Sequence, residues 1–179
     1  MRHDIIVPRD VPAQPWKNGE GLRRVLLHTP HWRISVADIS GEAVFSSLPG
    51  WDRLLIPLEG GELSLRIGRE SHHVDLEHPV RFRGEDEVNC AKPQRPIRVV
   101  NVMTDRAAAS LRCAVTDGQP DSDEPASAAV LLSGWARAGR RLVFPGTVFR
   151  GGSTPVFPED ARVAQLHLTH RPIQETAIP

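Results

Sequence analysis

The feature that most constrains the fold of this chain is the alternation of apolar and polar residues at every second position. Short runs of this kind recur along the sequence, and residues 32–37 and 63–67 are the clearest of them. A period of two places neighbouring side chains on opposite faces of a β-strand, so that one face is buried and the other meets solvent. No window carries an uninterrupted apolar stripe of helical period over three turns. The sequence therefore predicts an all-β fold.

Turn-forming residues divide the chain into many short segments. Fourteen Gly and 16 Pro punctuate the 179 residues. Further short strands are expected over residues 97–103, 111–115, 128–132, 141–144 and 162–169. Many short strands separated by turns are typical of a β-sandwich or a jelly-roll β-barrel. We therefore expect a jelly-roll architecture.

One shift in composition indicates how the chain is divided. Residues 117–127 are acidic, poor in apolar side chains and rich in Pro and Ser, which predicts a linker or a mobile loop. It separates residues 1–116 from residues 128–179. The second segment is short for an independent barrel, so we expect strands of the N-terminal region to complete it and give two coupled halves. From about residue 171 onward the chain is expected to form a weakly ordered tail.

Charge and cysteine content exclude several classes of protein. The chain has 22 basic and 22 acidic residues, so no overall field attracts nucleic acid. No segment reads as a signal peptide or approaches the roughly 20 apolar residues of a membrane span. A cytoplasmic protein with no membrane partner is expected. Cys90 and Cys113 are then expected to be thiols, although a single disulfide between them stays open.

The first segment that indicates function is a turn-rich cluster at residues 15–21. It places an aromatic ring (Trp16), an ammonium (Lys17) and a side-chain amide (Asn18) at consecutive positions. Lys17 and Asn18 are hydrogen-bond donors suited to a carboxylate or an amide, and the neighbouring glycines permit close approach to a ligand. The alternative is a tight turn covered by a buried indole.

The second segment is a strand that begins near Trp51 and ends at a Gly-Gly turn. Strand alternation places Trp51, Arg53, Leu55 and Glu59 on one face. Arg53 is a planar fork suited to a carboxylate, and Glu59 would hold that fork or contact a donor of the ligand. The alternative is a structural salt bridge between Arg53 and Glu59.

Asn101 interrupts an otherwise apolar strand over residues 98–103. A buried amide costs on the order of 1–3 kcal/mol unless its hydrogen bonds are met. We therefore expect Asn101 to bond to a neighbouring turn or to contact a ligand.

Taken together, these motifs resemble the HutD/Ves family of cupin-like proteins, which is linked to histidine utilisation in bacteria. The resemblance runs from residue 16 to residue 104. It rests on Trp16-Lys17-Asn18-Gly19 with Gly21, on Trp32-Arg33, on Phe45-Ser46 through Pro49-Gly50 to Asp52-Arg53, on Leu58-Glu59-Gly60 and on Asn101-Val102-Met103-Thr104.

The resemblance implies a bicupin fold, no transition metal, and a pocket for a small carboxylate such as formylglutamate or urocanate, with no settled catalytic activity. The chain departs from the family pattern at four positions. Glu20 stands where a small residue is usual, Arg23 where Thr is expected, Val25 where Glu is expected and Val99 where Asp is common. Compared with the family pattern, the chain lacks acids at Val25 and Val99 and has an additional cation at Arg23. This difference either makes the pocket more favourable for anions or indicates that the ligand has changed.

The histidines do not form a metal-binding pattern. Residues one or three apart on a strand point to opposite faces, which separates the members of each histidine pair. These pairs are His28 with His31, His72 with His73, and His167 with His170. The sequence also lacks a Gly-x-Ser-x-Gly elbow, a Cys–His pair and a phosphate-binding loop. No metal and no cofactor are therefore expected.

Three functions remain open at this level. The first is binding of a small anionic metabolite through Arg53, with help from Lys17, Asn18 and Asn101. The second is a metal-free isomerase or lyase in which Glu59 or a pocket histidine acts as acid or base and Arg53 stabilises developing negative charge. The third is a protein-interaction module with a vestigial pocket. A homodimer is plausible, because exposed strand edges invite pairing.

Overall fold

The computed structural model describes residues 5–16, 21–120, 125–151 and 155–170. Over these residues the chain is all-β apart from one short 3₁₀ helix, η1 (Pro8–Asp10), which confirms the prediction of an all-β chain. Every strand pairing is antiparallel. No helix in this part of the chain is long and apolar enough to cross a membrane.

The largest sheet has six strands in the order β2-β3-β4-β11-β6-β9. Its strands are β2 (Gln14–Pro15), β3 (Gly21–His28), β4 (Trp32–Ile39), β11 (Ile97–Asp105), β6 (Trp51–Pro57) and β9 (Val80–Arg83). A four-stranded sheet has the order β5-β10-β7-β8. It consists of β5 (Ala43–Val44), β10 (Val88–Cys90), β7 (Leu63–Ile67) and β8 (Glu70–Val74).

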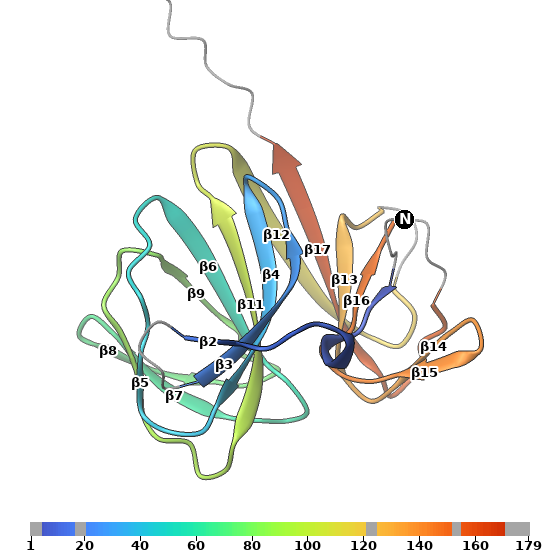
Figure 1. Cartoon of the computed structure of the whole chain (residues 1–179), viewed down its shortest axis with the longest axis horizontal. Helices are drawn as coiled ribbons and strands as arrows, with labels where there is room; N and C mark the ends of the chain where they lie inside the picture. Colours follow the sequence, from blue (N-terminus) through green and yellow to red (C-terminus); the bar gives the residue numbers. More distant parts are fainter. Residues whose placement is uncertain (1–4, 17–20, 121–124, 152–154, 171–179) are drawn as a thin grey trace, which may run out of the picture.

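A five-stranded sheet with the order β1-β16-β13-β17-β12 lies on the other side of the molecule (Figure 1). It consists of β1 (Ile5–Ile6), β16 (Val148–Arg150), β13 (Ala128–Ser133), β17 (Arg162–His170) and β12 (Ala109–Asp117). The C-terminal strands are thus joined in one sheet by β1 and β12 from the N-terminal part of the chain. A separate hairpin pairs β14 (Ala136–Ala138) with β15 (Arg141–Val143).

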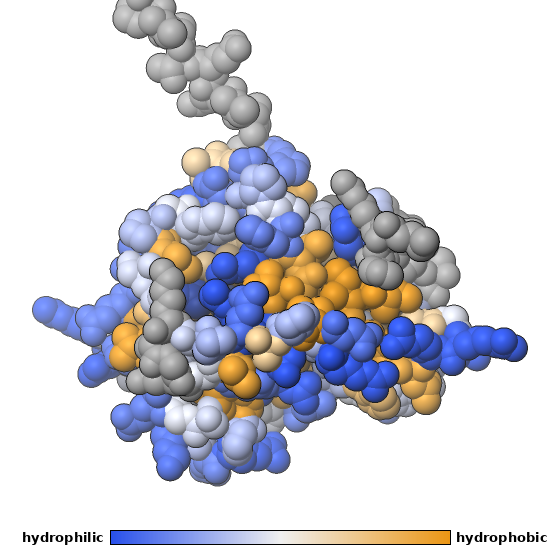
Figure 2. Space-filling model, in the orientation of Figure 1, coloured by the Kyte–Doolittle hydropathy of each residue, from blue (hydrophilic) through white to orange (hydrophobic). Residues whose placement is uncertain are grey.

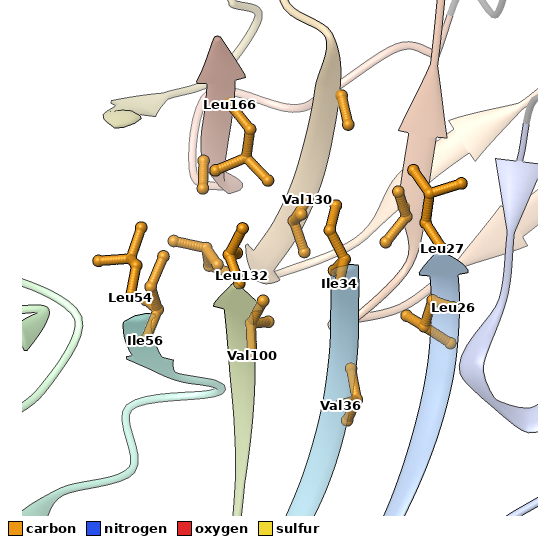
Figure 3. Close-up of a cluster of buried hydrophobic side chains, with 14 of the residues drawn as sticks. Leu26, Leu27, Ile34, Val36, Leu54, Ile56, Val100, Val130, Leu132 and Leu166 are labelled. Carbon is orange, nitrogen blue, oxygen red and sulfur yellow. The ribbon is translucent and has the colours of Figure 1, made fainter. Parts of the chain in front are cut away.

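Strand alternation explains how the sheets are layered. On β4, Ile34 and Val36 belong to a core shared with the five-stranded sheet, whereas Ala37 and Ile39 belong to a core shared with the four-stranded sheet. The six-stranded sheet therefore lies between the other two. Figure 3 shows the first core, in which side chains of β3, β4, β6 and β11 face those of β13 and β17. A third core lies between the five-stranded sheet and the β14–β15 hairpin.

The predicted linker corresponds to a connection between strands. β12 ends at Asp117 and β13 begins at Ala128. Residues 121–124 of this connection, and the predicted tail from about residue 171, lie outside the described residues.

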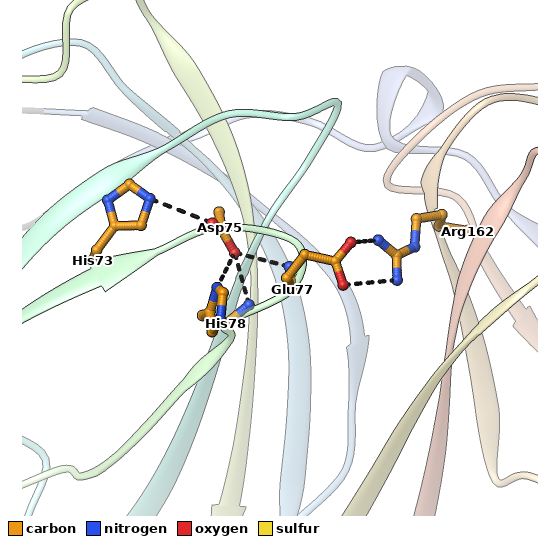
Figure 4. Close-up of polar contacts among 5 residues, drawn as sticks. All are labelled: His73, Asp75, Glu77, His78 and Arg162. Atoms are coloured by element: carbon orange, nitrogen blue, oxygen red, sulfur yellow. Dashed lines mark hydrogen bonds and ion pairs between the residues drawn. The ribbon is translucent and has the colours of Figure 1, made fainter.

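A polar contact joins the turn between β8 and β9 to the five-stranded sheet (Figure 4). The guanidinium of Arg162 forms a bidentate pair with the carboxylate of Glu77. The Nε of Arg162 also lies 3.0 Å from Oδ1 of Asp117. The hydrogen bond from Arg162 lowers the pKa of Glu77. The turn itself is held by Asp75, whose Oδ1 accepts the backbone N–H groups of Glu77 and His78 at 2.8 and 2.7 Å. This contact adds charged pairing to the apolar packing between the two sheets.

Candidate functional site

A cavity of about 260 Å³ opens on the face of the six-stranded sheet that is turned away from the five-stranded sheet. Side chains of β3, β4, β6 and β11 form its floor, and residues 44–48 form its rim. In the space-filling view a hollow with hydrophilic walls lies beside an apolar surface (Figure 2). The lining residues are Trp16, Arg23, Arg33, Ser35, Ala37, Ile39, Val44, Phe45, Ser46, Ser47, Leu48, Arg53, Leu55, Val99, Asn101 and Met103.

The strand register brings two arginines onto one row of this floor. Met103 on β11 is paired with Arg33 on β4 and with Arg53 on β6. Because directly paired residues of antiparallel strands point to the same face, the two guanidinium groups flank the methionine. We call Arg33, Met103 and Arg53 the arginine row. Asn101 occupies the next row, where it is paired with Ser35 and Leu55.

Arg53 is the most buried of these cations. Its residue surface is only 8% exposed, and its Nη1 donates to the backbone oxygen of Ser46 at 3.3 Å. Its Cζ lies 5.0 Å from the ring centre of Phe45 and 4.9 Å from that of Phe82, which are distances of cation–π contacts. Burial, and then the charge of Arg33, lower the pKa of Arg53 to about 10. Arg53 is therefore still a cation at neutral pH.

Arg33 and Arg23 add two more positive charges to the lining. Burial and the nearby charge of Arg23 lower the pKa of Arg33, and its Nη2 lies 2.8 Å from the sulfur of Met103. The Nε atoms of Arg23, Arg33 and Arg53 are all buried without a hydrogen-bond partner among the described residues. No carboxylate stands among the described lining residues. The cavity wall thus concentrates positive charge that no described lining residue neutralises.

The cavity also contains Asn101 and Trp16. Asn101 lines the floor, its Oδ1 is buried with no partner in the described part of the chain, and its backbone oxygen accepts the Ser35 hydroxyl at 3.4 Å. Trp16 lies in the lining and meets the ring of Phe45 edge-on, with 6.2 Å between ring centres. The other two predicted ligand contacts, Lys17 and Asn18, lie outside the described residues.

Glu59 does not join the cavity. β6 ends at Pro57, and the backbone turns at Glu59 with a φ of 57°. This turn breaks the alternation that placed Glu59 on the face of Arg53. Its side chain is 52% exposed and lies 3.8 Å from Arg98. The prediction that Glu59 shares a face with Arg53 is therefore wrong. The alternative prediction of a salt bridge between Glu59 and Arg53 is also wrong, because Glu59 pairs with Arg98 instead.

Several lining residues were not predicted as ligand contacts. Arg33 was noted only as part of a strand motif, and Arg23 only as a departure from the family pattern. Phe82 does not line the cavity but packs on Arg53 from β9, and nothing in the sequence singled it out, because a phenylalanine in a strand usually belongs to a core. The sequence does hold a signal for Arg33. Strand alternation places Arg33 on the same face as Ser35 and Ala37, opposite the face of the buried Ile34.

Histidine and cysteine side chains are absent from the described lining of the cavity. Among the described residues, no group of three or more His, Cys, Asp or Glu is arranged to hold a metal ion. Cys90 and Cys113 are both free, and they pack in or against different cores. Burial raises the pKa of Cys90 to about 11, so that it is a neutral thiol at physiological pH.

The rim of the cavity depends on close backbone approach at Gly84. Leu48 N donates to Gly84 O and Gly84 N donates to Trp51 O, both at 2.6 Å. A Cβ at position 84 would overlap the Leu48 carbonyl oxygen and lie 2.9 Å from Trp51 O. We expect Gly84→Ala to destabilise the fold by about 1–3 kcal/mol through overpacking, measured as a lower midpoint in urea.

Gly41→Ala is the matched control for this prediction. Position 41 has no neighbouring atom within 4 Å of an added Cβ. This substitution should leave stability unchanged or raise it slightly. Equal midpoints for the two variants would contradict the role given to Gly84.

Comparison with known proteins relates the chain to one family. The sequence model of the HutD family matches residues 8–142. The "Protein Ves" of Citrobacter koseri is 34% identical over 116 residues, which cover 59% of this chain and 61% of that protein. The match therefore spans less than two thirds of the length of this curated relative.

Two solved structures share the fold. HutD from Pseudomonas fluorescens SBW25 has a TM-score of 0.75 at 22% identity, covering 94% of this chain and 98% of its own. A "Cupin 2 conserved barrel domain protein" from Leptotrichia buccalis has a TM-score of 0.56 at 13% identity, covering 91% and 93%. At these identities the likeness shows a common cupin-like fold.

Proposed function

The chain belongs to the HutD family, and we propose that it binds a small carboxylate metabolite in the cavity that the arginine row lines. The observation that carries this proposal is the set of three guanidinium groups of Arg23, Arg33 and Arg53 with no carboxylate among the described lining residues. Buried like charges are costly unless an opposite charge is supplied. A bound anion would supply it, and planar carboxylates match the fork of a guanidinium.

The volume and the lining of the cavity support binding of a small molecule. A volume of about 260 Å³ suits a compact metabolite rather than a polymer. Leu55, Val99 and the aromatic ring of Phe45 provide an apolar wall beside the cations. This combination of mostly apolar surface with a few polar groups is typical of small-molecule sites. Val99, where the family pattern commonly has an acid, keeps this wall free of negative charge.

Binding is favoured over catalysis by the chemistry of the described lining. It contains no Asp, Glu, His, Lys, Cys or Tyr that could exchange a proton near neutral pH. The pKa of Arg53 is about 10, which is too high for a general base in that range. Glu59, the acid or base of the enzyme hypothesis, lies outside the cavity. The metal-free isomerase or lyase therefore loses its proposed acid or base.

Two finer features complete the proposal. The four-stranded and six-stranded sheets would form a first cupin-like half that holds the site, and the five-stranded sheet with the β14–β15 hairpin would form a second half. The inner face of that second half is occupied by apolar side chains such as Phe149 and Phe157, whose rings meet edge-on. The ligand would be a formylglutamate-like or urocanate-like acid, in keeping with the link of the family to histidine utilisation.

Thermal unfolding with and without candidate acids tests this function. At about 100 times its dissociation constant a ligand stabilises a protein by about 2.7 kcal/mol, which for a chain of this size is a rise in Tm of about 5–10 °C. We expect such a rise with formylglutamate, urocanate or glutamate. The control is the same acid with every carboxyl group converted to its methyl ester, which has no carboxylate and should give little change.

The salt dependence of the shift adds a second criterion. Because the cavity is partly open, added chloride should compete with a carboxylate and weaken its effect. If none of the acids raised the Tm more than its ester, the carboxylate site would be refuted and the interaction-module hypothesis favoured.

A further inference from the structure

Exposed large hydrophobic side chains cluster on and beside the β14–β15 hairpin. Among the described residues, four of the six exposed large hydrophobic side chains lie on or beside it. They are Trp135, Leu142, Phe144 and Val156, with exposed fractions of 42, 53, 54 and 50%. In Figure 2, apolar and strongly hydrophilic side chains lie together in the region where Figure 1 places this hairpin.

Two of these side chains, Leu142 and Val156, lie on the outer face of the hairpin, and Trp135 and Phe144 adjoin its two strands. Ala136 is paired with Val143, and both are buried in the third core, so this pair points inward. The next pair, Arg137 with Leu142, points outward, and Val156 is bridged to Arg137 on the same rung. Opposite residues of antiparallel strands point to the same side. The hairpin therefore presents an apolar outer face that no described element covers.

The backbone groups on the outer edge of β15 have no partner strand among the described residues. Arg137 N donates to Val156 O and Val156 N donates to Arg137 O, both at 2.9 Å. The main-chain groups of Arg137 thus point away from β15, which makes Arg137 and Leu142 a non-hydrogen-bonded pair. By the same alternation, the N–H and C=O of Leu142 point away from β14. Within the described residues, no strand pairs with that edge.

We infer that β15 pairs antiparallel with β15 of a second copy of the chain, around a two-fold axis at Leu142. An isologous contact of this kind is self-complementary, and Leu142 can exchange both of its free backbone hydrogen bonds with its own symmetry mate. The two leucine side chains would then pack on each other across the axis. Two hairpins would become one four-stranded sheet.

The register that this axis imposes also avoids repulsion between arginines. With the axis at Leu142, a residue that precedes Leu142 in one copy lies opposite the residue that follows it by the same number of positions in the other copy. Arg141 therefore faces Val143 of the second copy, and Arg140 faces Phe144. An arginine opposite an aromatic ring can make a cation–π contact. Within one copy the guanidinium of Arg141 lies 3.4 Å from Asp10, which partly balances its charge.

The size of the apolar face indicates how stable such a dimer would be. Since whole aromatic side chains bury about 150–250 Å², exposed fractions near one half give the four side chains on the order of 300–400 Å² per copy. Stable interfaces bury about 800 Å² per partner. The strand pairing adds polar area to the apolar part. We therefore expect a reversible dimer that dissociates on dilution.

Sedimentation velocity of the whole 179-residue chain over a range of concentrations tests this interface. Wild type should shift from monomer to dimer as concentration rises. Leu142→Lys should remain a monomer, because the axis would bring two ammonium groups together. Leu22→Lys is the control, since Leu22 is 44% exposed on β3 and should leave the dimer intact. A wild type that stays monomeric at all concentrations, or a Leu142→Lys variant that still dimerises, would overturn the inference.

A single-cysteine crosslink tests the register independently of stability. Hydrogen-bonded pairs have Cα atoms about 5.5 Å apart, which is within the range that a disulfide spans. Leu142→Cys should therefore form a reducible dimer under mild oxidation, whereas Leu22→Cys should not. The native cysteines contribute little background, because burial raises the pKa of both thiols. Equal crosslinking of the two variants would rule out the axis at Leu142.

Discussion

Replacing Arg53 with methionine is expected to raise the Tm of the unliganded protein and to abolish the rise in Tm that carboxylates produce. Burial and Arg33 lower the pKa of Arg53 to about 10, which corresponds to a penalty on the order of 3 kcal/mol for carrying the charge in the folded state. Because the folded pKa is below the unfolded one, this penalty is present throughout neutral pH and is relieved only as the pH rises through 10.

Methionine retains most of the aliphatic volume of Arg53 and removes its charge. The lost contacts with Phe45 and Phe82 offset part of the gain, since each cation–π contact contributes about 0.5–2 kcal/mol. We expect a net gain of about 1 kcal/mol, or a few degrees in Tm, by calorimetry with and without ligand. Arg69→Met, at an exposed turn, is the control and should change neither quantity. A large fall in the unliganded Tm would show that Arg53 is a structural anchor.

Ile56→Ala is expected to cost about 2–5 kcal/mol of unfolding free energy. Ile56 is fully buried on β6 and belongs to the core shared by the six-stranded and five-stranded sheets. The cavity left by the substitution would lie between these sheets, where little can move to fill it. Urea unfolding measured by fluorescence should therefore show a much lower midpoint.

A graded series makes this prediction sharper. Ile56→Val removes one methylene group and should cost only about 0.5–1.5 kcal/mol. The two substitutions should shift the whole unfolding transition without splitting it, because the core joins both sheets. A two-step transition in Ile56→Ala, with one step at the wild-type midpoint, would show that the sheets unfold independently.

Local pattern was sufficient to predict many of the strands, although β8, β9, β10 and β16 were not among the expected ranges. Alternation over residues 32–37 and 63–67 corresponds to β4 and β7, and the face of Arg53 follows from the same rule. The pairing of strands far apart in the chain could not be read in this way. That β11 lies between β4 and β6 depends on packing of the whole domain, and this arrangement is what brings Arg33 beside Arg53.

The prediction for Glu59 was wrong because of a local feature of the backbone. Alternation applies only while the chain is extended, and the strand stops two residues before Glu59. A non-glycine residue with a positive φ is uncommon, so nothing in the sequence indicated that the turn would begin at Glu59 rather than at the glycine pair that follows.

The strands that carry the arginine row also carry a large part of the main core on their opposite faces. Val100 and Val102 of β11, for example, are fully buried against the five-stranded sheet, while Asn101 and Met103 between and beside them line the cavity. A ligand in the cavity would therefore stabilise β11, and through β11 it would also stabilise the packing against the five-stranded sheet. Amide hydrogen exchange along β11 should slow when an acid is added, and residues with no ligand contact should share in that protection.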